Sequence, residues 1–190
     1  PLMCCLFLGL REGEALGLAW EHIDFEHGKV TICQQLQREK SKGGQFYIQQ
    51  GTKNGKSRVL DVPDFLLEVL AEEKNKQLRA RMAAGPAWCN QWNLCFTDAL
   101  GRPIKALTLW KHCKRIAASI GLPELRVHDL RHTNATLALV NGDDLKTVQA
   151  NLGHATAAFT LQRYVHASEQ MKRESANRMQ QFFENNVKKA

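Results

Sequence analysis

The chain is 190 residues long, with 44% hydrophobic and 24% charged residues, which is the balance of one soluble globular domain. Its longest apolar run, 2–10, is shorter than the ~20 residues that span a bilayer and lacks the flanks of a signal peptide, so we expect a cytoplasmic protein without membrane contact. Lys and Arg outnumber Asp and Glu by 26 to 19, and this net charge of +7 favours a polyanionic partner.

The first residue is Pro1 and the chain opens directly into an apolar helical stretch, so we expect a fragment of a longer polypeptide. The six cysteines show no disulfide framework, which favours free thiols. The side chains of Cys89, Cys95, His112 and Cys113 do not match the regular spacing of zinc ligands. We therefore expect neither a metal site nor a cofactor.

Residues 1–20 have the apolar spacing of two short helices, with a break around Gly9. Arg11 lies at this joint, directly before the second amphipathic run. Because the N–H groups at the start of a helix can bind a phosphate, Arg11 is a candidate phosphate ligand, with an ordinary surface arginine as the alternative. Glu14 follows three residues later and can pair with Arg11 if both residues are helical.

A sheet is predicted after Asp24, where apolar residues alternate with a period of two. The segments expected to form its three antiparallel strands are 29–33, 46–48 and 58–62. Asn54-Gly55, between the second and third strands, is typical of a type I′ turn, because both positions tolerate positive φ. Lys53 is therefore expected at the tip of a β-hairpin, with Lys56 as its rival for a chemical role.

Helical spacing dominates the rest of the chain. In a long helix that begins at Asp64 and ends before Gly85, the apolar residues expected on one face are Leu66, Leu70, Leu78 and Met82. A short strand is predicted at 94–97. Further helices are predicted at 109–120, 128–140, 144–152, 160–166 and 169–187. The predicted fold class is α+β and mainly α, a helical domain with a small three-stranded antiparallel sheet.

Two segments in the last third of the chain carry residues suited to phosphate chemistry. In a helix, His128 and Arg131 place an imidazole and a guanidinium on one face, although a capped surface helix with incidental charges explains this segment equally well. His154 follows a predicted helix end. Tyr164 lies further on among polar neighbours, whereas Tyr47, the other tyrosine, falls in a predicted strand.

These residues occur in a recognisable order. The chain resembles the tyrosine recombinase, or phage integrase, family over about residues 6–187, most closely the integrases of conjugative transposons and of phages of Gram-positive bacteria. The elements that carry the resemblance are Gly9-Leu-Arg11-Glu-Gly-Glu14, Lys53, His128-x-x-Arg131-His-Thr, Leu-Gly-His154 and Tyr164. Each element is weakly specific alone, but their joint order and spacing make coincidence improbable.

The resemblance implies a role for each site residue. Tyr164 attacks the scissile phosphate and forms a 3′-phosphotyrosyl bond, which stores the bond energy and removes the need for ATP. The side chains expected to stabilise the phosphate charge are Arg11, Arg131 and His154. Lys53 is expected to protonate the leaving 5′-oxygen and His128 to exchange a proton near the phosphate, with Glu14 in support. For His154, a simple helix cap is the alternative.

The same resemblance implies that 1–190 is a single catalytic domain from which an upstream DNA-clamping domain is absent. Residues 168–190 are expected to form a tail helix that docks on a neighbouring protomer, with packing on its own domain as the alternative. The expected partners are double-stranded DNA attachment sites, further copies in a homotetramer on DNA, and a directionality factor. The expected location is the bacterial cytoplasm, in association with the nucleoid.

Two other functions compete with the recombinase hypothesis. A type IB topoisomerase-like DNA relaxase uses the same kinds of residue but acts as a monomer, and the tail after Tyr164 and the short chain argue against it. A non-catalytic DNA-binding relative would keep the basic charge and lose the nucleophile or an arginine. Every expected catalytic position is filled here, so a recombinase is the hypothesis we favour.

Overall fold

The computed structural model describes residues 1–39, 41, 43–51 and 57–153, and beyond them residues 173, 176, 177, 179, 180 and 184. The first elements along the chain are α1 (Leu2–Phe7), α2 (Glu12–Leu16), β1 (Ile23–Asp24), β2 (Lys29–Ile32), β3 (Gln34–Glu39), β4 (Gln45–Gln50) and β5 (Arg58–Asp61). They are followed by α3 (Asp64–Ala84), α4 (Ala106–Ser119), α5 (Val127–Val140) and α6 (Leu145–Leu152). Single turns of 3-10 helix lie at Trp20–His22 and Gly85–Ala87.

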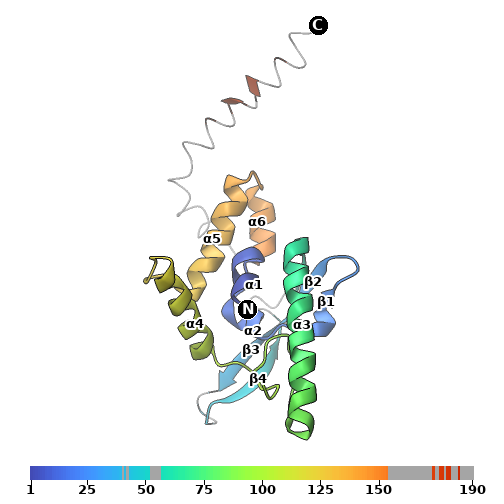
Figure 1. The fold of residues 1–190 in the computed structure, drawn as a ribbon. Helices are drawn as coiled ribbons and strands as arrows, with labels where there is room; N and C mark the ends of the chain where they lie inside the picture. Colours follow the sequence, from blue (N-terminus) through green and yellow to red (C-terminus); the bar gives the residue numbers. More distant parts are fainter. Residues whose placement is uncertain are drawn as a thin grey trace.

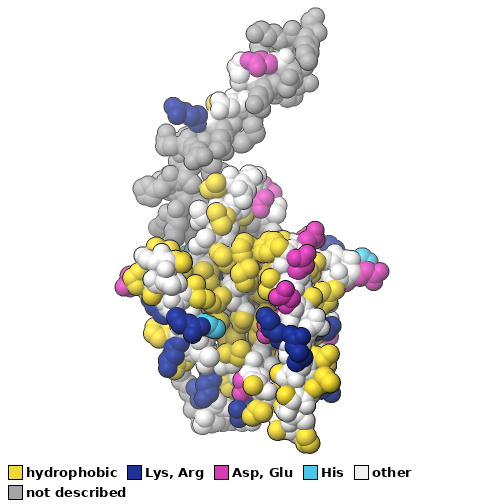
Figure 2. All heavy atoms as spheres, in the orientation of Figure 1, with side chains coloured by type: hydrophobic (Ala, Val, Ile, Leu, Met, Phe, Trp, Pro, Cys, Tyr) yellow, Lys and Arg dark blue, Asp and Glu magenta, His cyan; other side chains and the backbone are white. Residues whose placement is uncertain are grey.

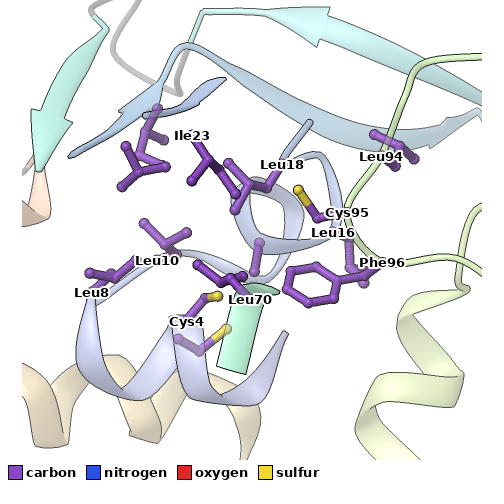
Figure 3. Packing of buried hydrophobic residues seen from close by; sticks show 14 of the residues in the cluster. Cys4, Leu8, Leu10, Leu16, Leu18, Ile23, Leu70, Leu94, Cys95 and Phe96 are labelled. Atoms are coloured by element: carbon purple, nitrogen blue, oxygen red, sulfur yellow. The ribbon is translucent and has the colours of Figure 1, made fainter. Parts of the chain in front are cut away.

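Helices α1 and α2 occupy the middle of the molecule (Figure 1). Helices α5 and α6 lie above them, α4 and α3 lie on opposite sides, and the β3–β4 pair lies below. Buried apolar side chains from α1, α2, α3, β1 and the loop before α4 meet in one core, part of which is drawn in Figure 3. A second, smaller apolar cluster joins α5 to α6. The mainly helical fold class is thus confirmed.

The predicted helices between residues 64 and 152 are confirmed to within a few residues at their ends. Local chemistry fixes these ends in α6. The Asp144 carboxylate accepts hydrogen bonds from the N–H groups of Lys146 and Thr147 at the start of the helix, and Gly153, with φ of 61°, ends it in the left-handed conformation. The predicted helix 160–166 and most of the predicted helix 169–187 lie outside the described residues.

Helix α3 buries a shorter apolar stripe than its spacing predicts. Leu66 and Leu70 are buried, but Leu78 is 55% and Met82 76% exposed, so the apolar face of the helix enters the core only in its first half. The second half of α3 contacts the domain through a polar residue instead. Gln77 accepts a hydrogen bond from the Trp20 indole at 2.7 Å, and its amide nitrogen donates to backbone carbonyls of the loop before α4.

The strand pairing differs from the predicted sheet. β2 pairs antiparallel with β1 and β5 in a three-stranded sheet, whereas β4 pairs with β3 in a separate two-stranded sheet. Segment 46–48 is therefore bonded to β3, and among the described residues it forms no hairpin with 58–62. Residues 52–56, which include the predicted turn and Lys53, lie outside the described part of the chain.

Strand β3 escaped prediction because its sequence, Gln34-Gln-Leu-Gln-Arg-Glu39, is polar and lacks apolar alternation. At the buried end of the strand, the side-chain amide of Gln34 donates a hydrogen bond to the Gly17 carbonyl at 2.8 Å. A Cβ atom at Gly17 would lie 2.5 Å from the Leu36 nitrogen. The close approach of α2 to β3 therefore depends on a glycine and a buried amide rather than on apolar periodicity.

Hydrophobic side chains also gather in the middle of one face, over α1 and its neighbours (Figure 2). The exposed large apolar residues of α1 and of the first half of α3 are Met3, Phe7, Phe65 and Val69. The rings of Phe7 and Phe65 meet edge to face, with centroids 4.8 Å apart.

Within the part of the chain that is described, no helix combines the length and apolarity needed to cross a membrane.

The joint between α1 and α2 depends on Gly9, as the sequence predicts. Its φ is 61°, which an L side chain adopts only with strain. A Cβ atom at this position would lie 2.5 Å from Leu152 Cδ2 and 2.7 Å from Asn134 Oδ1. Gly9 therefore allows the backbone of the joint to lie directly against α5 and α6.

We predict that Gly9→Ala lowers the free energy of unfolding by about 3 kcal/mol, because the left-handed backbone and the overlap with α5 and α6 both oppose the new methyl group. Urea denaturation measures this change. Gly43→Ala is the matched control, since Gly43 has φ of 64° but a Cβ atom there would have no neighbour within 4 Å, and we expect a loss of about 1 kcal/mol. Equal losses in the two variants would contradict the packing role of Gly9.

Candidate active site

The carboxylate of Glu14 lies at the centre of a cluster of arginines. Its side chain is fully buried in α2. Arg11, the residue before α2, donates to Glu14 from Nη1 at 2.8 Å and from its backbone nitrogen at 3.0 Å. Arg58, the first residue of β5, donates to both carboxylate oxygens, from Nη2 at 2.7 Å and from Nη1 at 3.1 Å. Nη1 of Arg131 in α5 lies 4.0 Å from Glu14 Oε2. These four residues are called the Glu14 cluster below.

The same three arginines bind the C-terminal end of α6. Each arginine donates a hydrogen bond to one of three consecutive backbone carbonyls. Arg58 Nε donates to Asn151 at 2.7 Å. Arg131 Nη2 donates to Leu152, and Arg11 Nη2 donates to Gly153 at 3.2 Å. The last carbonyls of a helix have no partner within the helix and carry partial negative charge. The arginines therefore satisfy these carbonyls and fix the end of α6 relative to α2, α5 and β5.

Charge balance in the cluster keeps Glu14 ionised. Burial raises the pKa of its carboxyl, but the hydrogen bonds and charges of Arg58 and Arg11 outweigh burial, so the pKa lies below its ordinary value. Burial and the charge of Arg11 lower the pKa of Arg131 to about 9, which still leaves the guanidinium charged at neutral pH. The Glu14 cluster thus holds three positive charges and one negative charge, and the surplus suits an anion.

Arg131 is the most deeply buried of the three arginines, with 1% of its surface exposed. Its Nη1 donates to the carbonyl of Gly9, so the guanidinium connects the α1–α2 joint to the end of α6. These carbonyls use only part of its donor capacity, because a guanidinium carries five N–H groups. Arg11 is less enclosed, with 21% of its side chain exposed. One fixed cation therefore lies deep in the cluster and another nearer its surface.

His128 lies in the first turn of α5, one turn before Arg131, at the surface of the domain and with its ring partly covered. Its ring meets that of His132 edge to face, with centroids 4.6 Å apart. Partial burial of the ring and the charge of Arg131 lower the pKa of His128. The imidazole is therefore mainly neutral at neutral pH and can accept a proton.

Of the seven residues predicted for the site, the structure brings three into direct contact or close proximity within one cluster: Arg11, Glu14 and Arg131. His128 lies beside them on α5. The other three, Lys53, His154 and Tyr164, lie outside the described residues, although Gly153 of the α6 end directly precedes His154. Sequence reasoning missed Arg58. Its only sequence signal is its place at the start of the strand that follows Lys53, which does not reveal a pairing with Glu14.

The buried carboxylate predicts a pH dependence of stability. The folded pKa of Glu14 lies below the value of about 4.3 in an unfolded chain, so its contribution is complete above that value and is lost as pH falls through the folded pKa. We expect Glu14→Gln to cost about 3 kcal/mol at neutral pH, with the difference from wild type shrinking as the solution is acidified. Denaturation at a series of pH values measures it, and a difference independent of pH would contradict the assignment.

Comparison with known proteins identifies the family. Residues 2–171 match the model of the phage integrase family. A tyrosine recombinase XerC-like protein of Caldanaerobacter subterraneus subsp. tengcongensis is 33% identical over 183 residues, which are 92% of this chain and 47% of that protein. The integrase of Mycobacterium phage L5 is 31% identical over 161 residues, 84% of this chain and 41% of the integrase. The chain thus spans about half or less of the length of these relatives.

Solved structures agree in fold. The XerH site-specific recombinase, bound to a palindromic difH substrate in a post-cleavage complex, has a TM-score of 0.62 at 28% identity, over 92% of this chain and 43% of XerH. The Tn1549 transposon integrase, in complex with a circular intermediate DNA, has a TM-score of 0.74 at 24% identity, over 93% of this chain and 57% of that one, a likeness of fold alone. This chain belongs to the phage integrase family of tyrosine recombinases.

Proposed function

We propose that the chain is the catalytic domain of a site-specific DNA recombinase that integrates or excises a mobile element. The observation that carries the proposal is the Glu14 cluster, in which Arg11 and Arg131 come from distant parts of the chain and are fixed beside one buried carboxylate and one helix end. The cluster has a surplus of positive charge, and Arg11 donates to the carbonyl of Gly153, the residue that precedes the proposed phosphate ligand His154.

In the proposed reaction, the Tyr164 hydroxyl attacks the scissile phosphorus while the bond from phosphorus to the 5′-oxygen breaks. His128, neutral at neutral pH, accepts the tyrosine proton, and Lys53 gives a proton to the leaving 5′-oxygen. The side chains that stabilise the non-bridging oxygens are Arg11, Arg131 and His154. Attack of a second 5′-hydroxyl on the phosphotyrosyl bond reverses these steps and rejoins the strands.

The two arginines suit this task because they are fixed before the phosphate arrives. Hydrogen bonds to Glu14 and to the end of α6 hold the guanidinium of Arg11, and backbone carbonyls hold that of Arg131. Donors fixed in advance need little reorganisation as charge builds up on the phosphate oxygens. The role of Glu14 in this proposal is to hold the cations rather than to contact DNA.

The proposed partner is the double-stranded attachment site of the element, in keeping with the net charge of +7 and with the difH complex of the related XerH. The same proposal includes an upstream DNA-clamping domain, assembly into a homotetramer on DNA, and docking of tail 168–190 in trans. It also includes a directionality factor and association with the nucleoid. A type IB relaxase is the second candidate, and it would relax supercoiled DNA without exchanging strands.

Covalent trapping tests the nucleophile. On a nicked suicide duplex that carries the attachment sequence of the element, we expect the full-length protein to form a metal-independent adduct that survives denaturing electrophoresis. Tyr164→Phe should abolish the adduct, because it removes the only proposed nucleophile. Tyr47→Phe is the matched control at the other tyrosine, which lies in β4, and should retain it. An adduct that persists in Tyr164→Phe, or is absent from the full-length protein, would contradict the proposal.

The pH profile of the same reaction tests His128. Because the pKa of His128 is lowered, we expect the acidic limb of the adduct-forming rate to lie below about pH 6.5. The ion pair of Arg126 with Asp129 affects the pH at which this limb lies, since Arg126 lowers the pKa of His128 and Asp129 raises it. Arg126→Gln should therefore move the limb to higher pH. A limb that stays in place in Arg126→Gln would assign it to another group.

A further inference from the structure

We propose that Arg58 is a positioning residue for the recombinase reaction, one that neutralises Glu14 and thereby keeps Arg11 and Arg131 available to the phosphate. The inference rests on the proposed function. Arg58 is not among the residues expected to touch DNA or the tyrosine, so its effect would pass through Glu14 and through the end of α6.

The contacts of Arg58 fit such a role. All three of its guanidinium nitrogens are used: Nη1 and Nη2 donate to the two oxygens of Glu14, and Nε donates to the carbonyl of Asn151. Only 10% of its side chain is exposed. A planar fork satisfies three acceptors at once, which the single ammonium group of a lysine cannot reproduce. Arg58 therefore joins β5 to α2 and to the end of α6.

Arg58 also lies between two segments of the proposed site. It opens the strand that follows the segment carrying Lys53, and it binds the last turn of the helix that precedes His154. A Cβ atom at Gly153 would lie 3.3 Å from Arg58 Nη1, so the end of α6 packs closely on the guanidinium. Arg58 thus fixes the start of β5, which follows the segment of the proposed proton donor Lys53, against the end of α6, which precedes the proposed phosphate ligand His154.

Loss of Arg58 would redirect the other two arginines. Glu14 would lose its two hydrogen bonds from Arg58 and remain a buried carboxylate, which demands another cation. The nearest are Arg11, already bonded to it at 2.8 Å, and Arg131 at 4.0 Å. Both would be drawn toward Glu14, and the net charge of the cluster would fall from two positive charges to one. Both changes weaken the stabilisation of a phosphate.

The test compares Arg58→Gln, Arg58→Lys and the double variant Glu14→Gln/Arg58→Gln in the full-length protein. Arg102→Gln is the matched control, because it removes an arginine from an exposed ion pair with Asp98. Two quantities are measured in each protein: the single-turnover rate of adduct formation at saturating attachment-site DNA, and the rise in Tm when sodium phosphate replaces sodium chloride at constant ionic strength. Circular dichroism and DNA affinity monitor folding and binding.

We expect Arg58→Gln to lower the adduct-forming rate about 100-fold with little change in DNA affinity, and to remove most of the phosphate-dependent rise in Tm. Arg58→Lys should fall between wild type and Arg58→Gln. The double variant should regain about tenfold of the lost rate, because removing the carboxylate ends its attraction of Arg11 and Arg131, which the carbonyls at the end of α6 still hold. Arg102→Gln should behave as wild type in both measurements.

Equal losses in Arg58→Gln and in the double variant would overturn the inference, because a purely structural role gives no reason for rescue by a second substitution. An unchanged rate in Arg58→Gln, or a wild-type protein whose Tm does not respond to phosphate, would overturn it as well. The proposed function fails separately: a protein that binds phosphate in an Arg58-dependent manner but forms no adduct would support the role of Arg58 and refute DNA cleavage through Tyr164.

Discussion

The burial of one carboxylate is the constraint on which the rest of the site depends. An ion withdrawn from water costs several kcal/mol unless opposite charges and hydrogen bonds replace its hydration. Glu14 obtains these from Arg11 and Arg58, with Arg131 close by. Because the three arginines belong to the start of α2, to β5 and to α5, satisfying one side chain brings three separate segments together.

The end of α6 supplies the complementary half of this arrangement. Its last carbonyls accept the same arginines that face Glu14, so each guanidinium is held from two sides. The close approach of Gly9 brings the α1–α2 joint within reach of Arg131. Gly9, Glu14 and the end of α6 thus act together, and protein groups alone fix the positions of the arginines. Such fixed dipoles and charges are what electrostatic stabilisation of a phosphate requires.

The sequence predicts the parts of this unit that have a local signature. Helix spacing gave α3 to α6, and the break at Gly9 placed Arg11 at a helix start. Strand β3 was missed because buried glutamines, not apolar alternation, hold it against α2. Without β3, the prediction paired segment 46–48 with 58–62 instead of with β3. Arg58 was missed because its partner Glu14 is distant in sequence, and no periodicity encodes such a contact. The assignments of Lys53, His154 and Tyr164 stay predictions.

The hydrogen bond from Arg11 to Gly153 joins residues 142 positions apart. Contacts of such high sequence separation form late, since the entropy of closing the intervening chain must be overcome first. During synthesis, Arg11 leaves the ribosome long before the end of α6 that holds it. A nascent or prematurely terminated chain therefore lacks the assembled arginines even when its first helices have folded. A chain that ends before α6 thus has Arg11 but lacks the carbonyl of Gly153 that accepts its hydrogen bond.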